Sequence, residues 1–271
     1  MSKNPTICAI DDEQVILDSI KKLCSAENWD VDITMDAAVG LDKMKTDKYN
    51  LAICDIMMPG MDGFEFLQQV QKMKIKTPVI ITTGFSTLEN AVKSLYSGAI
   101  DFLPKPFTFE ELISVVGRGL QYEKIQSLID INPMDSDTRD EQIYYIPCPP
   151  RYNRLGYSAW TFLEDDGYIK IGVTDLFLRT IDLIEEVELM KPEEEIFQGN
   201  TCAFIKTQDG MTHNILAPVS GRIIQRNERI LEDFTLMEKD PYFKGWLYSV
   251  VPANLEYETK YLVPCSSDRN Y

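Results

Sequence analysis

Side chains that could carry out phosphoryl chemistry stand where apolar, strand-like runs end. They form four groups in the first 125 residues: Asp11–Asp12, Asp55, Thr82–Thr83 and Lys105. In a parallel sheet the carboxyl ends of the strands share one edge, and sites form beyond it. Carboxylates gathered there repel one another unless a cation lies among them, and hydrated carboxylate oxygens suit Mg²⁺. A lysine and a hydroxyl beside them can bind phosphoryl oxygens, so these residues predict an aspartyl-phosphate site.

The elements that would position these side chains alternate between strands and helices. Strands are expected at 6–10, 30–36, 49–55, 77–84 and 100–106, and helices at 13–28, 37–48, 63–74, 86–99 and 108–129. The apolar face of the first helix is expected to contain Val15, Ile16, Ile20 and Leu23. Five such β-α units with continuously apolar strands predict an α/β fold, a doubly wound five-stranded parallel sheet with helices on both faces.

Four segments of this region resemble the receiver domain of bacterial response regulators, which has a flavodoxin-like fold. They are, in order, AIDDEQVI, LAICDIMMPGMDGFEFL, PVIITTG and GAIDFLPKPF. The resemblance implies that Asp55 is the phosphoacceptor and that a sensor histidine kinase is the donor. It also implies Mg²⁺ ligands, with Asp11 bound directly or through water: Asp11, Asp12, Asp55 and the backbone carbonyl of Met57.

The same resemblance implies roles for three further side chains. Thr83 and Lys105 would contact the phosphoryl oxygens, and Phe102 would be the aromatic switch that packs inward when Thr83 moves. The Lys105–Pro106 peptide is commonly cis in this family. Gly84 departs from the alanine usual after the threonine, and glycine loosens a loop. The alternative for each acidic residue taken alone is that it caps a helix or faces water.

Domain boundaries are expected at 1–125 for the receiver, 126–150 for a linker, 151–263 for a second domain and 264–271 for a tail. The segment 130–142 is polar and acidic, as linkers are. The aromatic, proline-rich run IYYIPCPPRYNR that follows is expected to pack as an extended arm, with a short recognition segment as the alternative. The long helix from 108 either covers the receiver's own sheet along its whole length or supplies an interdomain or dimer contact.

The second domain is predicted to be mainly β. Hairpins are expected at Glu164–Gly167 and at Asp209–Gly210, a dipeptide that suits a tight turn. The segment TDLFLRTIDLIEEVEL is expected to begin as a helix and continue as a strand, and GRIIQRNERI is expected to be a strand.

Three segments of this domain resemble the H-protein of the glycine cleavage system, a lipoyl carrier. They are GYIKIGVTDLF, LAPVSGRIIQRNE and DPYFKGWLYSVVPAN. The resemblance implies a lipoyl/biotinyl-type β-sandwich, also called a barrel-sandwich hybrid. It places the carrier lysine at a hairpin tip before the Pro218 turn, and counting back from that turn gives Gly210. Glycine has no amine to lipoylate. Lys206 could be modified only if the hairpin register differs from the expected one.

Charge and composition narrow the function classes. The net charge of −16 is spread over both halves of the chain, which disfavours nucleic-acid binding. The start of the chain has no signal-peptide pattern and no apolar run spans a membrane, so we expect a cytoplasmic protein. The six cysteines have no C-x-x-C spacing and are expected to be free thiols in a reducing compartment. The single histidine, His213, is expected to be an ordinary polar strand residue.

The sequence thus favours a two-component response regulator whose output is protein binding and which is not an enzyme beyond its own phosphorylation and dephosphorylation. The expected partners are a sensor histidine kinase, a protein that binds the H-protein-like domain, and a second copy in a phosphorylation-dependent homodimer. The alternative is a receiver-regulated lipoyl carrier in one-carbon or related metabolism that uses Lys206. A transcription factor is a third possibility, but no helix-turn-helix segment follows the receiver.

Overall fold

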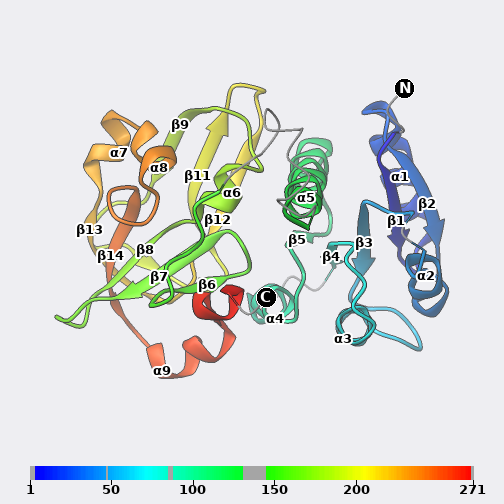
Figure 1. Ribbon diagram of the computed structural model, residues 1–271, viewed down its shortest axis with the longest axis horizontal. Coiled ribbons are helices and arrows are strands. Elements are labelled where there is room, and N and C mark those ends of the chain that lie inside the picture. Colours follow the sequence, from blue (N-terminus) through cyan, green and yellow to red (C-terminus); the bar gives the residue numbers. More distant parts are fainter. Residues whose placement is uncertain (1–3, 47, 85–87, 131–144, 270–271) are drawn as a thin grey trace. The chain divides into compact units, whose positions relative to one another are not determined.

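The computed structural model describes residues 4–46, 48–84, 88–130 and 145–269, and the chain divides into two compact units. The first is a parallel sheet with helices on both faces, as predicted (Figure 1). Its strands, in spatial order, are β2 (Asp30–Thr34), β1 (Thr6–Ile10), β3 (Leu51–Asp55), β4 (Val79–Thr83) and β5 (Asp101–Pro104). The helices that follow these strands along the chain are α1 (Gln14–Ala26), α2 (Ala37–Met44), α3 (Gly63–Lys72), α4 (Leu88–Tyr96) and α5 (Phe109–Asp130).

Alternation along the buried strands supplies two apolar faces. Cys8 and Ile10 of β1 belong to a core cluster that includes Leu41 of α2 and Phe66 of α3. On the opposite face, Leu51 of β3 packs against α5. Because every residue of β1, β3 and β4 is buried, both sides of the sheet must be covered by helices.

The apolar face of α1 differs from the predicted one. Leu17, Ile20 and Cys24 are buried, whereas Val15 is 75% exposed. The buried set follows the i, i+3, i+7 spacing of one helix face, and Val15 lies in the first turn on a different side. The prediction that Val15 belongs to the buried face is therefore wrong.

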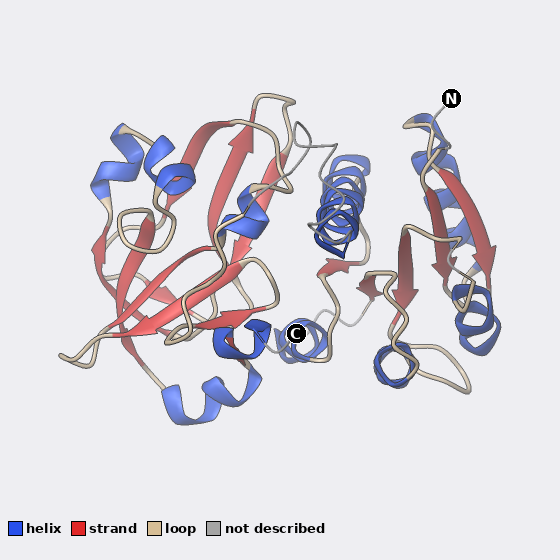
Figure 2. Cartoon of the chain, viewed as in Figure 1, coloured by secondary structure: helices blue, strands red, loops and turns tan. Residues whose placement is uncertain are grey.

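The second unit is mainly β, as predicted, with short helices between strands (Figure 2). One sheet has seven strands in the order β10 (Glu195–Ile196), β13 (Gly221–Arg226), β14 (Trp246–Pro252), β8 (Ile169–Val173), β7 (Ala159–Leu163), β6 (Asn153–Leu155) and β15 (Val263–Pro264). The other has β12 (Thr212–Leu216), β11 (Thr201–Thr207) and β9 (Ile184–Leu189). The helices are α6 (Asp175–Leu178), α7 (Glu228–Glu232), α8 (Thr235–Lys239), α9 (Leu255–Glu258) and the 3₁₀ helices η2 (Thr259–Tyr261) and η3 (Cys265–Arg269).

Two boundaries in this unit depart from the expectation. The strand predicted for GRIIQRNERI ends at Arg226, and α7 begins at Glu228. Asn227 lies between the strand and the helix, and its side-chain amide stabilises this junction by donating to the carbonyls of Lys244 and Trp246. The residues expected to be a tail from 264 include the end of β15 and the whole of η3.

The junction is described only in part. Helix α5 continues to Asp130, five residues beyond the predicted receiver boundary, and 131–144 lie outside the described residues. The described part of the aromatic run lies along the second domain, as expected for an arm. The Tyr152 hydroxyl donates to the carbonyl of Tyr242 at 3.0 Å, and Ile146 N–H donates to Asp175 Oδ2 at 2.5 Å.

The expectation of six free thiols is wrong for one pair. Cys148 and Cys265 form a disulfide across 117 positions of the chain, with their Cα atoms 5.6 Å apart. Cys8, Cys24, Cys54 and Cys202 are free and buried. No other cysteine lies near Cys148 or Cys265 in the sequence, so their pairing depends on β6 and β15 lying side by side.

A tryptophan fills the centre of the second unit. Trp160 of β7 is fully buried, and its indole N–H donates to the carbonyl of Val173 at 3.0 Å. The ring lies directly over Gly172 of β8, where an added Cβ would come within 2.3 Å of ring atom Cζ2. A side chain at position 172 and the indole therefore exclude each other.

We expect Gly172→Ala to lower the unfolding free energy of the second domain by about 2 kcal/mol, because an overpacked core must shift backbone or side chains. Urea unfolding followed by tryptophan fluorescence measures this in a Trp29→Phe background, which leaves Trp160 and Trp246 as the reporters. Gly117→Ala is the control, since a Cβ there meets open space and alanine favours a helix. Equal midpoints for Gly172→Ala and the wild type would contradict the prediction.

Candidate functional site

Three of the predicted site residues meet at the carboxyl edge of the parallel sheet. Lys105 Nζ lies 2.6 Å from Asp11 Oδ2 and 2.8 Å from Asp55 Oδ1. All three side chains are at least nine-tenths buried. Asp11 follows β1, Asp55 ends β3 and Lys105 follows β5, so the strand order β1-β3-β4-β5 brings them together. The Lys105–Pro106 peptide is cis, as the resemblance implied.

Backbone amides hold the other carboxylate oxygens in place. Asp55 Oδ2 accepts from Met57 N–H at 2.7 Å, and Asp11 Oδ1 accepts from Glu13 N–H at 3.0 Å. The loop after Asp55 is closed by a hydrogen bond from Gly63 N–H to the carbonyl of Ile56. Each carboxylate therefore has one oxygen fixed by the backbone and one turned toward Lys105.

The two oxygens that face Lys105 are buried but incompletely satisfied. Asp11 Oδ2 and Asp55 Oδ1 receive no well-directed hydrogen bond from any described residue, although the ammonium is close. A carboxylate oxygen has more than one lone pair, so each of these oxygens can bind a further cation besides the ammonium. No three His, Cys, Asp or Glu side chains in the described ranges are grouped as a metal cluster. Mg²⁺ is usually held by only one or two carboxylates, with water as further ligands, so the oxygen set fits Mg²⁺.

Burial and charge act against each other at this cluster. Burial raises the pKa of Asp11 above its usual value, and the ammonium of Lys105 opposes that rise. For Lys105, burial lowers the pKa, but the ion pairs with Asp11 and Asp55 outweigh it and leave the pKa raised. At neutral pH the lysine is thus held in its charged form between two carboxylates.

We expect Lys105→Met to destabilise the first domain by about 3 kcal/mol at pH 7, because it leaves buried carboxylates unpaired. Without the ammonium the pKa of Asp11 rises further, so the folded state binds more protons than the unfolded state. The stability of the variant then falls as pH rises above 3.8, the ordinary pKa of an aspartate. The loss of stability relative to the wild type should therefore be smaller at pH 5 than at pH 7. Hydrogen exchange of β1 and β3 amides, corrected for intrinsic rates, measures it; a pH-independent deficit would contradict this account.

The predicted phosphoryl-binding and switch residues lie on β4 and β5. Thr83 is fully buried at the end of β4, and its carbonyl accepts from Lys105 N–H at 2.8 Å. Thr82 pairs with Asp55 in the strand register, and its buried hydroxyl has no hydrogen-bond partner among the described residues. Phe102 is partly buried and packs against the core cluster that contains Phe66.

Two predicted residues are not joined to the cluster by a side chain. Asp12 is only partly buried, and Met57 contributes its backbone while its side chain is 56% exposed. Glu13 was not predicted, but its Oε1 lies 3.8 Å from Lys105 Nζ. The only sequence signal for Glu13 is its position directly after Asp11 and Asp12.

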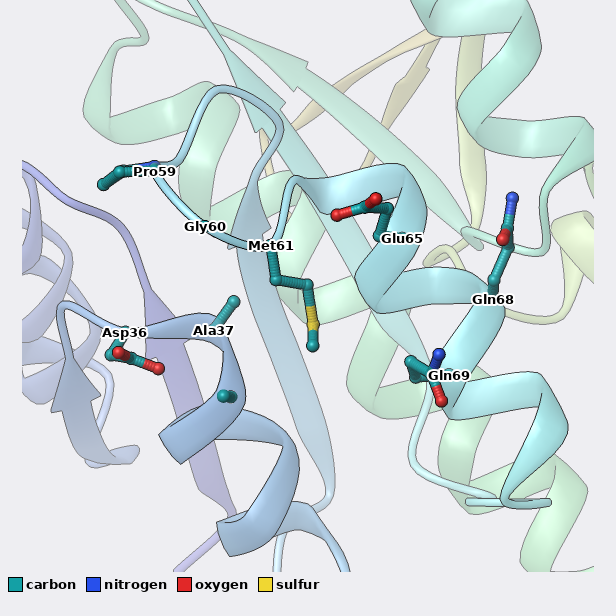
Figure 3. A pocket seen from close by; sticks show the side chains of 9 residues that line it. Asp36, Ala37, Pro59, Gly60, Met61, Glu65, Gln68 and Gln69 are labelled. Atoms are coloured by element: carbon teal, nitrogen blue, oxygen red, sulfur yellow. The ribbon is translucent and has the colours of Figure 1, made fainter.

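A hollow borders the loop that follows Asp55. It has a volume of about 490 Å³, and Figure 3 shows Met61 pointing into it. The lining residues come from α2, α3 and this loop: Asp36, Ala37, Ala38, Pro59, Gly60, Met61, Glu65, Gln68 and Gln69. Asp36 and Glu65 are already engaged as helix caps. None of the predicted site residues lines this hollow.

The hairpin of the second domain has the predicted register. Lys206 pairs with Thr212 across β11 and β12, and Gly210 lies in the turn at φ +81° with open space where a Cβ would be. Lys206 therefore lies within the strand, and its ammonium is 3.6 Å from Glu186 of β9. The tip position that the H-protein resemblance assigns to a carrier lysine is a glycine in a left-handed turn.

The base of this hairpin is held by a polar cluster. Thr207 Oγ1 lies 2.5 Å from Asp209 Oδ1 and 3.1 Å from His213 Nε2. His213 is buried and its ring meets that of Phe177 edge-on. His213 is a residue of β12, as expected, and its side chain lies on the buried face of that strand.

Comparison with known proteins assigns both domains. Residues 7–117 match the family model for the response regulator receiver domain, and residues 151–269 match the model for the glycine cleavage H-protein. The chain therefore carries a receiver domain followed by an H-protein-like domain, as the sequence predicted.

Curated relatives match the first part. Response regulator ArlR of Staphylococcus epidermidis is 37% identical over 126 residues, which cover 46% of this chain and 57% of ArlR. Transcriptional regulatory protein HprR of Escherichia coli is 36% identical over 133 residues, 49% of this chain and 59% of HprR. The chain thus spans less than two thirds of the length of these relatives.

Among solved structures, a receiver domain protein from Clostridium thermocellum is 29% identical, with a TM-score of 0.43, and covers 45% of this chain and 98% of its own. A glycine cleavage system H protein from Mycobacterium marinum is 25% identical, with a TM-score of 0.37, and covers 39% and 87%.

Proposed function

We propose that this protein is a two-component response regulator in which Asp55 accepts a phosphoryl group from a sensor histidine kinase and the second domain provides a protein-binding output. The observation that carries the proposal is the buried arrangement of Asp11 and Asp55 around Lys105 Nζ, within 2.8 Å of both carboxylates. The similarity of residues 7–117 to receiver domains supports it.

Each side chain of the site has its own role in phosphoryl transfer. A carboxylate oxygen of Asp55 attacks the phosphorus of a phosphohistidine, an O–P bond forms and the N–P bond breaks. Met57 N–H fixes Asp55 Oδ2, and Lys105 supplies a positive charge for the transferred phosphoryl oxygens. Thr83 would bind another of these oxygens through its hydroxyl.

The divalent ion would be held by Asp11, Asp12, Asp55 and the backbone carbonyl of Met57. When bound, Mg²⁺ supplies charge neutralisation at the phosphoryl oxygens. Asp11 contributes through a buried carboxylate whose second oxygen is anchored by Glu13 N–H. This hard oxygen set is the chemistry that Mg²⁺ prefers.

Phosphorylation would shift an existing equilibrium between two receiver conformations. Thr83 is joined to the Lys105 backbone, and Phe102 packs against the receiver core, so movement of either changes the surface around β5 and its flanking helices. The output is then a change in what the second domain binds, or formation of a homodimer. The chemistry is confined to the receiver's own phosphorylation and dephosphorylation, and we do not propose an enzyme acting on a separate substrate.

We place this activity in the cytoplasm and without nucleic acid as a partner. Among the described residues, no helix combines the length and apolar character needed to cross a bilayer. The net charge of −16 works against counterion release from a nucleic acid. A gel-shift experiment at low salt tests this part, and retention of duplex DNA would overturn it.

The test of the output is a pull-down with the full chain as bait. Wild type with beryllofluoride and Mg²⁺, wild type without them, and Asp55→Ala with both are compared by quantitative mass spectrometry. We expect proteins enriched only with the first bait. Identical partners in all three states would show that phosphorylation does not control binding.

A further inference from the structure

The second domain contains one cysteine pair whose chemistry the proposed signalling function does not use. Cys148 lies in the segment before β6, and Cys265 is the first residue of η3. Both are buried in an aromatic cluster with Tyr152, Trp160 and Tyr242. The bond ties the first described residues of the domain to its last ones.

We propose that Cys148–Cys265 is a reversible thiol–disulfide exchange site, opened by a dithiol reductant, whose state decides whether residues 145–152 and 262–269 stay attached to the second domain.

The other cysteines are poorly suited to such exchange. Cys8, Cys24, Cys54 and Cys202 are all buried and free. Burial raises the pKa of Cys8 to about 11 and the pKa of Cys24 and of Cys202 to about 12. Because the thiolate is the reactive form, these thiols are inert near neutral pH. Redox chemistry is therefore confined to the bonded pair.

The contacts that remain when the bond opens are non-covalent. The Tyr152 hydroxyl donates to the carbonyl of Tyr242 at 3.0 Å, and the Tyr152 ring stacks on that of Phe162. Ile146 N–H donates to Asp175 Oδ2, and its carbonyl accepts from the Tyr242 hydroxyl at 3.0 Å. Cys265 N–H donates to the carbonyl of Tyr152 at 3.0 Å. Strand β15 pairs with β6 through only two residues. A covalent link that closes a long loop contributes more to holding its ends than these non-covalent contacts do, so opening should loosen the two segments and leave the sheets intact.

The cytoplasmic location bears on how the Cys148–Cys265 disulfide behaves, and this step rests on the proposed function. A receiver phosphorylated by a histidine kinase works where nucleoside triphosphate is available, in the cytoplasm. Disulfides there are usually transient, catalytic or redox-sensing. Phosphorylation of Asp55 is measured separately from the thiols, so failure of the proposed function and failure of the exchange proposal can be told apart.

The exchange balances with a dithiol as the co-reactant. One thiolate of the reductant attacks Cys148 Sγ, because Cys148 is 6% exposed and Cys265 is not exposed. A mixed disulfide forms, and Cys265 leaves as a thiolate that takes up a proton. The second thiol of the reductant then attacks the mixed disulfide, which releases Cys148 as a thiol and oxidises the reductant to its own disulfide. Two electrons and two protons pass to the protein.

Equilibration of the full chain with graded ratios of reduced and oxidised dithiothreitol, followed by acid trapping and alkylation, tests the proposal. We expect Cys148 and Cys265 to become alkylated together in one two-electron transition. Amide exchange in 145–152 and 262–269 should rise about tenfold or more over the same ratios, as expected for local opening, while β11 and β13 stay protected.

Two variants accompany this experiment. Cys202→Ala, a free buried cysteine, should keep the transition, and Cys148→Ala should exchange rapidly at every ratio. Should Cys148→Ala not fold, the wild-type titration alone decides. Free thiols at positions 148 and 265 in the fully oxidised buffer, or reduction without a change in exchange, would overturn the proposal.

Discussion

Asp55→Asn should take up no phosphoryl group from acetyl phosphate and Mg²⁺, whereas the wild type should take up one per chain. The amide of asparagine is neutral and a far poorer nucleophile than a carboxylate, so we expect labelling to fall at least about 100-fold. Asp55 is the right target because one of its oxygens is anchored by Met57 N–H and the other lies 2.8 Å from Lys105 Nζ. Intact-mass spectrometry measures the gain, and treatment with hydroxylamine identifies an acyl phosphate.

The matched control is Asp42→Asn, the same chemical change on the exposed surface of α2, where Asp42 forms an ion pair with Lys45. It should label like the wild type. Chelation of Mg²⁺ should reproduce the loss seen in Asp55→Asn. A label that persists in Asp55→Asn, or that maps to another residue of the wild type, would remove the basis of the signalling proposal.

The receiver site could be predicted because its geometry follows from the order of the strands. Once β1, β3, β4 and β5 are parallel neighbours, the residues that end them must share an edge. Asp11, Asp55 and Lys105 are separated by 44 and 50 positions, and yet they meet within 2.8 Å. The register of the β11–β12 hairpin was predictable for a related reason, because a tight turn such as Asp209–Gly210 fixes strand register, whereas the sandwich fold of the second domain was expected only from the H-protein resemblance.

The features that could not be predicted depend on packing between segments whose sequences carry no periodic signal. The Cys148–Cys265 bond requires β15 to lie beside β6, and two-residue strands leave no periodic signal. The exposure of Val15 was not predicted, because overlapping sets of apolar residues, with and without Val15, could each form the buried face of α1. The burial of His213 follows the alternation of β12, but the contact between its ring and the hydroxyl of Thr207 could not be predicted, because it forms across the turn.

The wild-type chain should gain no lipoyl group when it is incubated with lipoate–protein ligase, ATP and lipoate, whereas Gly210→Lys should gain one. Gly210 lies at the hairpin tip with open space around its Cα, so a lysine side chain there projects into solvent. Its φ of +81° is unfavourable for lysine, but the cost is only about 1 kcal/mol per residue. The register seen for β11 and β12 therefore places residue 210 at the exposed hairpin tip, which is the position that the H-protein resemblance assigns to the carrier lysine.

Lys206 is the other lysine of this hairpin that could accept a lipoyl group in this experiment. It is half-exposed, but it lies within β11 and pairs with Glu186, so its amine is not presented at a tip. Lys206→Arg in the Gly210→Lys background should leave the gain in mass unchanged, and peptide mapping should locate the lipoyl group at position 210. A lipoyl group on Lys206 of the wild type would instead favour the carrier function, in which the receiver regulates a cofactor-bearing domain. Absence of the group from both chains would show that the domain has also lost the surface that the ligase recognises.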